Sequence, residues 1–196
     1  MQYEYYQQAQ QDPELILMCG DSAEVSLLPT ITRCWTRIGQ QRVISTPAVK
    51  ADKQWDWGAV NVLTGESIHL LHARRNNVGL RRLLAAIARQ YRLGDHPQRR
   101  VILFLDNDKA HKAKVVAQLC AKHQHQIQME WLPAYTPELN PQEDIWQHMR
   151  RRVTHNYYFE HMHKLQEAIN HFHAELLDDP QQVLRLISKW THLIST

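Results

Sequence analysis

The first third of the chain carries the pattern of β-strands. Residues 14–21, ELILMCGD, form an apolar run ending in Gly and Asp, which predicts a buried strand followed by a loop. Two further stretches, EVSLLP and TRCWTRIGQQRVISTP, look like strand pieces broken by Pro29, Gly39 and Pro47. Residues 55–72 alternate apolar and polar side chains around the turn LTGES, which predicts a β-hairpin.

After this hairpin, the spacing of apolar residues changes to that of a helix. Apolar residues recur at i, i+3, i+4, i+7 and i+11 from Leu80 to Tyr91, which predicts an amphipathic helix. The run RRVILFLDND then predicts a strand that is buried on both faces. The elements expected beyond it are a helix over 111–123, a strand over 127–133, a helix over 141–156, and helices near 164–177 and 180–193. Antiparallel strands followed by βαβ units indicate an α/β protein.

The bulk composition fits one globular domain with an appendage. The chain has 196 residues, of which 43% are hydrophobic and 22% charged. Three scattered cysteines give neither a disulfide framework nor zinc spacing. No apolar run approaches the length of a membrane span, and no targeting pattern is present, so we expect a cytoplasmic protein without a membrane partner. We expect a linker or truncated N-terminal extension over 1–13, a catalytic domain over 14–156, and a helical appendage over 157–196.

Charge is distributed unevenly, although the net charge is only +3. Between Ala73 and Arg100 a single acid, Asp95, accompanies a run of arginines. These are Arg74, Arg75, Arg81, Arg82, Arg89, Arg92, Arg99 and Arg100. Such a run suits contact with DNA phosphates, and the alternative is a solvated helix face.

Three acids stand where strands end or a helix begins. Asp21 and Asp106 each follow an apolar strand, and Glu143 lies in the first turn of a later helix. Ligands gather at the carboxyl ends of strands in α/β sheets, so these side chains are able to converge. Carboxylate oxygens suit Mg²⁺, and two such ions about 4 Å apart serve phosphodiester chemistry.

Three motifs carry a resemblance to a known family. They are Asp21 with the following SAEVSLLP and RCWTRIGQ, then ILFLDNDKAH, then LPAYTPELNPQEDIW. Together they resemble the catalytic domain of DDE transposases, most closely the bacterial insertion-sequence branch related to mariner elements. The resemblance covers about residues 14–156. It implies a ribonuclease-H-like fold, with a mixed five-stranded sheet flanked by helices and extra C-terminal helices.

The resemblance also implies an activity and a site. Asp21, Asp106 and Glu143 would form the triad that binds two Mg²⁺ or Mn²⁺ ions for DNA strand cleavage and strand transfer at insertion-sequence ends. Asn107 and His111 would contact the triad or the DNA. The implied partners are double-stranded DNA, a second copy of the chain in a homodimer on DNA, and a separate helix-turn-helix polypeptide encoded upstream.

Two departures from the family pattern leave further metal ligands open. Ser22 stands where the family commonly has an acid, with Glu24 further on, and Asp108 stands where it commonly has Ala. Arg150 follows Glu143 by seven residues on the same helix face, so it is a candidate phosphate contact or an ordinary solvated arginine.

Glu143 also has a structural alternative, because Asn140 and Pro141 would start a helix that Glu143 caps. A cap does not require the three prolines of LPAYTPELNP, whereas a carboxylate held in a fixed position does. Trp146 is expected in the core. The closely spaced histidine pairs, His171 with His173 among them, are expected on the surface.

Two other functions remain open. VILFLDND resembles the opening motif of haloacid-dehalogenase-like phosphatases, in which Asp106 would be the nucleophile. The other alternative is that the chain is a non-catalytic remnant, or a DNA-binding or dimerisation partner of a split transposase.

Overall fold

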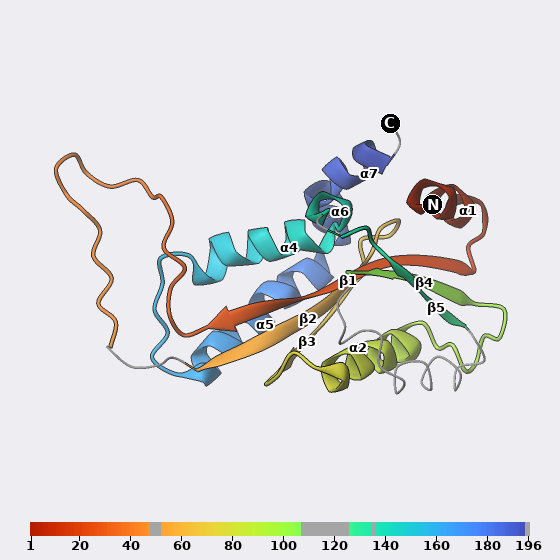
Figure 1. The fold of residues 1–196 in the computed structure, drawn as a ribbon, viewed down its shortest axis with the longest axis horizontal. Coiled ribbons are helices and arrows are strands. Elements are labelled where there is room, and N and C mark those ends of the chain that lie inside the picture. Colours follow the sequence, from red (N-terminus) through yellow and green to blue (C-terminus); the bar gives the residue numbers. More distant parts are fainter. Residues whose placement is uncertain (48–51, 107–125, 135, 195–196) are drawn as a thin grey trace.

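The computed structural model describes residues 1–47, 52–106, 126–134 and 136–194 (Figure 1). The strands are β1 (Leu15–Ser26), β2 (Lys53–Asn61), β3 (Ser67–His72), β4 (Arg100–Leu105) and β5 (Ile127–Trp131). The helices are α1 (Gln2–Gln11), α2 (Asn77–Gln90), α4 (Gln142–Met149), α5 (Met162–Asp178), α6 (Pro180–Leu186) and α7 (Ser188–Ile194). A 3₁₀ turn, η2 (Pro137–Leu139), precedes α4, and a π-helical turn, η3 (Arg150–Thr154), follows it.

The strands form one mixed sheet in the order β3-β2-β1-β4-β5. The β3-β2-β1 half is antiparallel, whereas β4 runs parallel to both β1 and β5. The predicted hairpin, the buried strand after the arginine run and the five-stranded mixed sheet are therefore confirmed. The β1–β2 register places Asp21 opposite Gly58.

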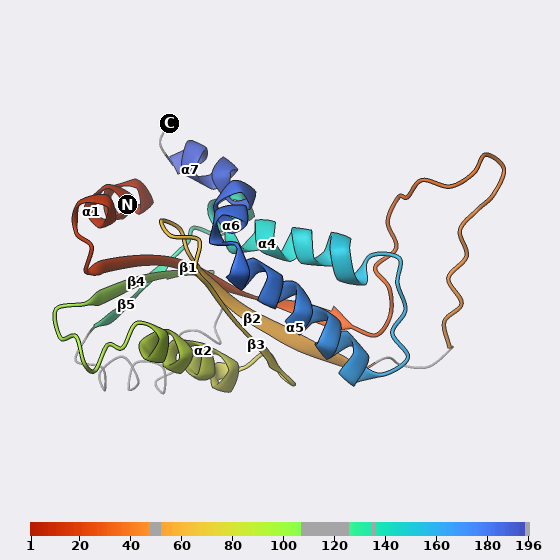
Figure 2. The ribbon, with the colours of Figure 1, turned by 180° about the vertical axis from the view of Figure 1, so that it is seen from behind.

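Helices cover both faces of this sheet (Figures 1 and 2). Side chains alternate along β1, so that Ile16 and Met18 face α2 while Leu17 and Cys19 face α4 and α5. α2 turns its predicted apolar stripe to the sheet, and Leu80, Leu83, Leu84 and Ile87 are fully buried there. Trp146 is fully buried on the other face, as the sequence predicts.

Both ends of the chain pack against the sheet domain. Residues 2–11, expected to be a linker or truncated extension, form α1, in which Ala9 is buried and the ring of Tyr5 contacts that of Phe104. Helices α5 to α7 contribute buried side chains to the same core cluster as β1, β4 and α4. The predicted appendage over 157–196 therefore shares its core with the residues before it.

Strand β1 differs from the sequence prediction. It does not end at Asp21 but continues to Ser26, because Ala23 and Val25 are buried and the whole segment pairs with β2. Gly20 does not mark a turn. A β-carbon there would come within 3.1–3.3 Å of Leu105, Leu103 and the carbonyl oxygen of Gly58, so its missing side chain allows close packing.

The strands predicted over 32–47 are also wrong. This segment has no strand and projects from the domain as a long loop (Figure 1), in which Trp35 and Ile38 are fully exposed. The helix predicted over 141–156 starts one residue later and changes to a π-helical turn at Arg150. The helix predicted over 111–123 lies outside the described residues. Among those described, no helix is long and apolar enough to cross a membrane.

Candidate active site

Asp21, Asp106 and Glu143 line one open cleft of about 470 Å³. Asp21 comes from the middle of β1, Asp106 directly follows β4, and Glu143 lies in the first turn of α4. Because β1 and β4 are adjacent parallel strands, the position of Asp106 at the end of β4 brings it beside the second half of β1. The structure thus brings the three acids together from three elements.

Burial and, to a smaller extent, the two neighbouring acids raise the pKa of Asp21. Its side chain is buried, with an exposed fraction of 8%, and Oδ1 accepts a hydrogen bond of 2.6 Å from the Ser22 N–H. Burial, followed by the charges of Asp106 and Glu143, raises the pKa of Asp21 to about 7, against the lowering effects of the Ser22 hydrogen bond and Arg75. A cation bound between these acids would relieve this penalty.

Arg75 places a positive charge at the edge of the cleft. Its guanidinium donates to Asp106 Oδ2 at 3.1 Å and to Ser22 Oγ at 3.2 Å. It also lies over the ring of Trp55, 5.4 Å from the ring centroid. Arg75 was predicted as a DNA contact, and the structure puts it beside the carboxylates.

The loop before α4 is fixed by its own side chains. Thr136 Oγ1 donates to the Pro133 carbonyl at 2.8 Å, and Pro137 begins η2. Asn140 is buried. Its amide donates to the Gly20 carbonyl at 3.2 Å, and its Oδ1 accepts from the Gln142 N–H at 3.2 Å. Asn140 thereby ties the start of α4 directly to β1, one residue before Asp21.

Glu143 does not act as a capping residue. The Asn140 N–H, which a capping glutamate would engage, donates instead to the Pro137 carbonyl at 3.0 Å. Within the described part of the chain, the Glu143 carboxylate makes no hydrogen bond, and it lines the cleft. The structural alternative for this residue is therefore not supported.

Both terminal helices hold this loop from outside. The carbonyl of Leu139 accepts hydrogen bonds from Trp190 Nε1 on α7 at 2.9 Å and from Gln2 Nε2 on α1 at 3.1 Å. Trp190 is 1% exposed. Its burial makes α7 part of the support for the segment that carries Glu143.

The cleft suits hard divalent ions by its donors. It offers three carboxylates and one opposing guanidinium, and carboxylate oxygen is the preferred ligand of Mg²⁺. In the described part of the chain, only Asp56, His69 and His173 form a set with ligand atoms all within 4.8 Å of one another. Within the same described residues, Asp21, Asp106 and Glu143 do not form such a set, although all three line the cleft.

Other predicted site residues lie elsewhere. Arg74 is exposed, and neither Arg74 nor Arg150 is among the residues that line the cleft. Glu24 pairs with Lys53 at 2.7 Å on the exposed end of β1 and is also outside the cleft. Asn107, Asp108 and His111 lie outside the described residues.

One histidine departs from the surface position predicted for it. His173 is 2% exposed, and its Nε2 lies 2.7 Å from Oδ2 of the fully buried Asp56. The ring of His69 stacks on that of His173 at 3.7 Å, and its Nδ1 lies 3.4 Å from Asp56 Oδ1. The surface position predicted for His171, on the same helix, is confirmed, because its side chain is exposed.

Sequence reasoning missed Trp55 and Asn140 as parts of the cleft. Trp55 lies in the predicted hairpin, and no local pattern shows that its ring would lie under Arg75. The sequence predicts Asn140 only as the start of a helix. Its place in the Leu-Asn-Pro part of the transposase-like motif was the signal that could have identified it as part of the cleft.

Comparisons with known proteins agree with this geometry. The family model described as DDE superfamily endonuclease matches residues 16–166. The chain belongs to the DDE superfamily endonuclease family. The matched range holds Asp21, Asp106 and Glu143 and ends within α5.

The chain is also 26% identical, over 152 residues, to an uncharacterized protein of insertion element IS630 from Shigella sonnei. That alignment covers 78% of this chain and 43% of the relative, so the chain spans less than half of that protein's length.

Solved structures show the same fold as this family member. The catalytic domain of Mos1 mariner transposase matches with a TM-score of 0.63 and 15% identity, covering 99% of this chain and 87% of that one. A mariner Mos1 paired end complex with Mg matches with a TM-score of 0.69 and 18% identity, covering 99% of this chain and 58% of that one. These matches confirm the ribonuclease-H-like fold implied by the sequence motifs.

Proposed function

We propose that this chain is the catalytic domain of a transposase that cuts DNA strands and joins them at insertion-sequence ends. The observation that carries the proposal is the convergence of three acids in one cleft, with the pKa of Asp21 raised to about 7 by burial and by the other two. A site that gathers three carboxylates against one guanidinium is suited to bind cations. The family membership adds independent support.

Each side chain in the cleft has a proposed role. Asp21, Asp106 and Glu143 hold two divalent ions, Mg²⁺ or Mn²⁺. Such ions activate the attacking oxygen and stabilise the leaving oxygen of a phosphodiester. A Mos1 complex with Mg and another with Mn are among the structural matches, which supports this choice of ions.

The arginines and two residues of the second motif, Asn107 and His111, serve the DNA. Arg75 contacts the phosphate beside the acids, since it is anchored to Asp106 and supported by Trp55. Arg74 and Arg150 contact phosphates further out, and Asn107 and His111 contact DNA near the triad. In this proposal water attacks the phosphorus in line and displaces the 3′ oxygen, which leaves as a 3′-hydroxyl. This hydroxyl later attacks a second phosphodiester and displaces its 3′ oxygen in turn, and no covalent bond to the protein forms.

The partners are proposed to be double-stranded DNA, a second copy of the chain and a helix-turn-helix polypeptide. Several structural matches are Mos1 complexes named for strand transfer or for a transposon end, which supports a DNA partner. The insertion-element relative is more than twice as long as the segment matched here, so a separate or preceding DNA-recognition region fits the remainder. We place the activity in the bacterial cytoplasm, at the nucleoid.

The fold does not favour the phosphatase alternative. In that reading β4 would be the first strand of a parallel sheet, whereas it follows an antiparallel three-stranded unit and lies beside β1. Asp106 also shares its cleft with two further acids and an arginine. The non-catalytic remnant remains the alternative that an activity assay must exclude.

The test is cleavage of supercoiled plasmid DNA by the purified chain in MnCl₂. We expect nicking that depends on the metal and falls by on the order of 10³-fold in Asp106→Asn, because a ligand of the ions is lost. Glu24→Gln is the matched control, since Glu24 is an acid paired with Lys53 outside the cleft. Metal-independent nicking, or equal activity in both variants, would refute the triad, and inactivity of the folded wild type would favour the remnant.

A further inference from the structure

The outward face of α2 carries positive charge without compensation. The helix, NVGLRRLLAAIARQ, contains three arginines and no acid. Arg81, Arg82 and Arg89 are all exposed, while Leu80, Leu83, Leu84 and Ile87 on the opposite side are buried. Arg82 and Arg89 are separated by about two helical turns and point in nearly the same direction, with Arg81 about 100° from Arg82. We call Arg81, Arg82 and Arg89 the α2 arginine face.

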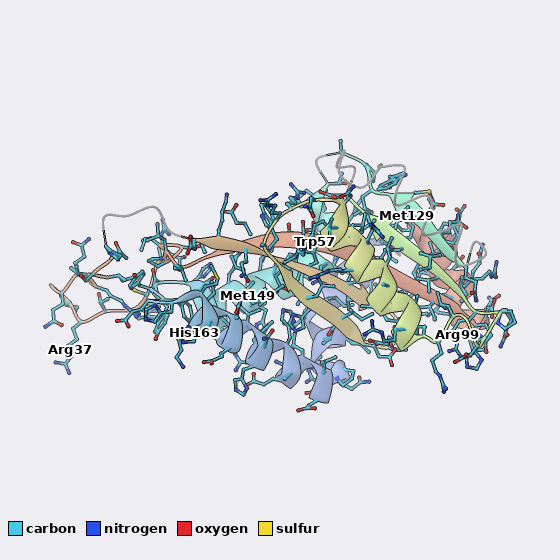
Figure 3. All side chains as sticks on the ribbon, turned by 90° about the horizontal axis from the view of Figure 1, so that it is seen from below. Arg37, Trp57, Arg99, Met129, Met149 and His163 are labelled. Atoms are coloured by element: carbon cyan, nitrogen blue, oxygen red, sulfur yellow. The ribbon has the colours of Figure 1, made fainter. Side chains whose placement is uncertain are left out.

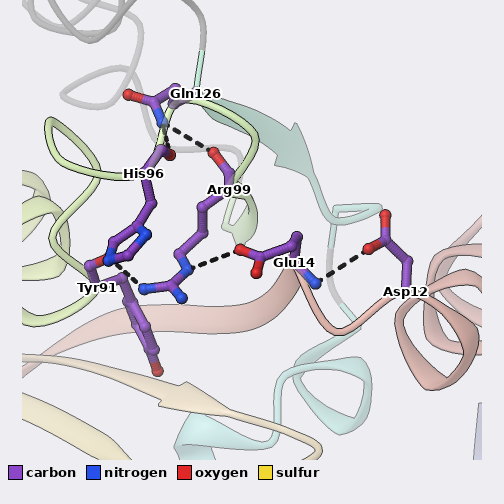
Figure 4. A network of polar contacts seen from close by, with 6 residues as sticks. All are labelled: Asp12, Glu14, Tyr91, His96, Arg99 and Gln126. Carbon is purple, nitrogen blue, oxygen red and sulfur yellow. Dashed lines mark hydrogen bonds and ion pairs between the residues drawn. The ribbon is translucent and has the colours of Figure 1, made fainter.

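Other arginines of the same sequence run are occupied by structural contacts. Arg92 pairs with Asp95 at 3.3 Å, Arg99 with Glu14 at 3.1 Å and Arg100 with Asp12 at 3.3 Å. Figure 4 shows Arg99 between Glu14 and the carbonyl of Tyr91, to which it donates at 2.8 Å. Arg99 and Arg100 thereby tie the segment after α2 to the residues just before β1.

The α2 arginine face has no such contacts. Within the ranges that the structure describes, Arg81, Arg82 and Arg89 take part in no ion pair and no side-chain hydrogen bond. A solvated helix face usually alternates acids and bases at i and i+4, because like charges on one face repel. Here the residues four positions before Arg82 and Arg89 are Val78 and Ala85, so no acid on the helix offsets these arginines. A surface of this kind is suited to a polyanion.

The position of this face connects it to the cleft. Arg75, which lines the cleft, immediately precedes Asn76, whose side chain caps α2 by accepting from the N–H groups of Val78 and Gly79. α2 then runs for about 21 Å along the opposite face of the sheet from α4 and α5 (Figures 1 and 3). The cap fixes the helix so that its arginines lead away from the cleft edge.

We propose that the α2 arginine face is a second DNA surface, which binds the phosphate backbone of the duplex beyond the segment held in the cleft. The proposal rests on the proposed function, because that function makes DNA the partner. Arginine contacts with phosphate position a duplex without reading its sequence. The face would thus hold DNA of any sequence, leaving selection of the site to other parts of the assembly.

Salt dependence of binding tests this surface directly. The probe is a fluorescently labelled duplex of about thirty base pairs and arbitrary sequence, titrated by anisotropy in EDTA from 50 to 200 mM NaCl. The affinity falls as salt rises, and each phosphate contact makes the negative slope of log K against log salt steeper by about 0.9. We expect the triple variant Arg81→Gln/Arg82→Gln/Arg89→Gln to reduce the magnitude of that slope by about 2 to 3.

Two further variants separate charge from folding. Arg81→Lys/Arg82→Lys/Arg89→Lys keeps the charge and should keep the slope. Arg92→Gln/Arg100→Gln/Arg185→Gln removes the same charge from arginines paired with Asp95, Asp12 and Asp179, and should change the slope by less than about 1. An equal fall in both Gln variants would indicate only a net-charge effect and would overturn the proposal.

The outcomes also separate this proposal from the proposed function. A wild-type chain that cuts DNA, but whose slope is unchanged by the α2 substitutions, overturns the α2 surface alone. A slope that depends on α2 in a chain that never cuts DNA overturns the catalytic proposal alone. A wild-type chain with no affinity for the duplex contradicts both.

Discussion

Asp21 is stabilised in its neutral form by the fold. Its pKa is raised from 3.8 to about 7, with burial as the largest cause. A group with a raised pKa contributes stability that is present below its unfolded value and lost as the pH rises through its folded value. The metal-free chain should therefore lose stability between about pH 4 and pH 7, on the order of a few kcal/mol.

Because a charged Asp21 is unfavourable in the folded chain, removing its charge should stabilise the metal-free protein. In EDTA at pH 8, Asp21→Asn should melt several degrees higher than the wild type, because no buried charge remains. Adding MnCl₂ should raise the melting temperature of the wild type and leave the variant unchanged. Differential scanning calorimetry checks both, with Glu24→Gln as the control. A variant that melts lower in EDTA would contradict the account of Asp21.

The buried Asp56–His173 pair predicts sensitivity to acid. Burial is the largest cause that lowers the pKa of His173, and its hydrogen bond to Asp56 opposes this. Burial alone would raise the pKa of Asp56, but hydrogen bonds from His173 and His69 outweigh it and lower that pKa. Because the pKa of His173 is lower in the folded chain, the unfolded chain takes up the proton first as the pH falls below about 6.5. The folded protein therefore loses stability in that range. The depressed carboxylate adds a further loss at lower pH.

His173→Leu tests this pair. We expect it to be less stable at pH 7.5 by roughly 1–3 kcal/mol, because leucine has no donor for the buried Asp56. Between pH 7 and 5 its stability should change less than that of the wild type, as measured by urea denaturation. His163→Gln, an exposed change on the same helix, should follow the wild type throughout. Equal pH slopes for all three proteins would contradict the titration of His173.

At the scale of elements, the sequence predicted periodic segments well and long-range pairing poorly. The hairpin, β4 and α2 follow from local patterns that burial confirms. The end of β1 was misplaced because Gly20-Asp21 looks locally like a turn, whereas pairing with β2 continues the strand. The 32–47 segment has strand-like composition but no neighbouring strand to pair with in the structure.

The same limit applies to the site. The triad was predicted from motif resemblance, and its three acids do meet in one cleft. The place of Arg75 over Trp55, and the burial of His173 against Asp56, depend on contacts between residues distant in sequence. Periodicity within one element carries no information about either.

Helix α7 supports the loop before α4 through the hydrogen bond from Trp190 to the Leu139 carbonyl. Trp190→Phe removes the donor to the Leu139 carbonyl while keeping an aromatic side chain in the core. We expect a small loss of stability, about 1 kcal/mol. We expect a several-fold lower kcat for plasmid nicking and a higher Mn²⁺ concentration at half-maximal activity, because Glu143 is held less firmly. Trp35→Phe, on the exposed loop, is the control. A stability loss without any change in the metal dependence would show that Trp190 serves packing only.

At the scale of the whole molecule, the C-terminal helices belong to the central core. Their buried residues are Leu165, Ile169, Phe172, Leu176, Val183, Ile187 and Trp190, all within the cluster that includes β1 and α4. Removing residues 157–196 should leave a chain without a cooperative thermal transition, because this face of the sheet would be exposed to water. Near-ultraviolet circular dichroism against the full chain measures this. A truncated chain that melts cooperatively and still nicks DNA would show that residues 1–156 fold without the C-terminal helices.

The most direct test of the proposed metal-binding triad is a crystal of the chain soaked in MnCl₂, examined by anomalous scattering. We expect two manganese peaks about 4 Å apart in the cleft, in contact with carboxylate oxygens of Asp21, Asp106 and Glu143. An empty cleft in a crystal that shows manganese bound elsewhere, at Asp56 and His69 for example, would contradict the proposed triad.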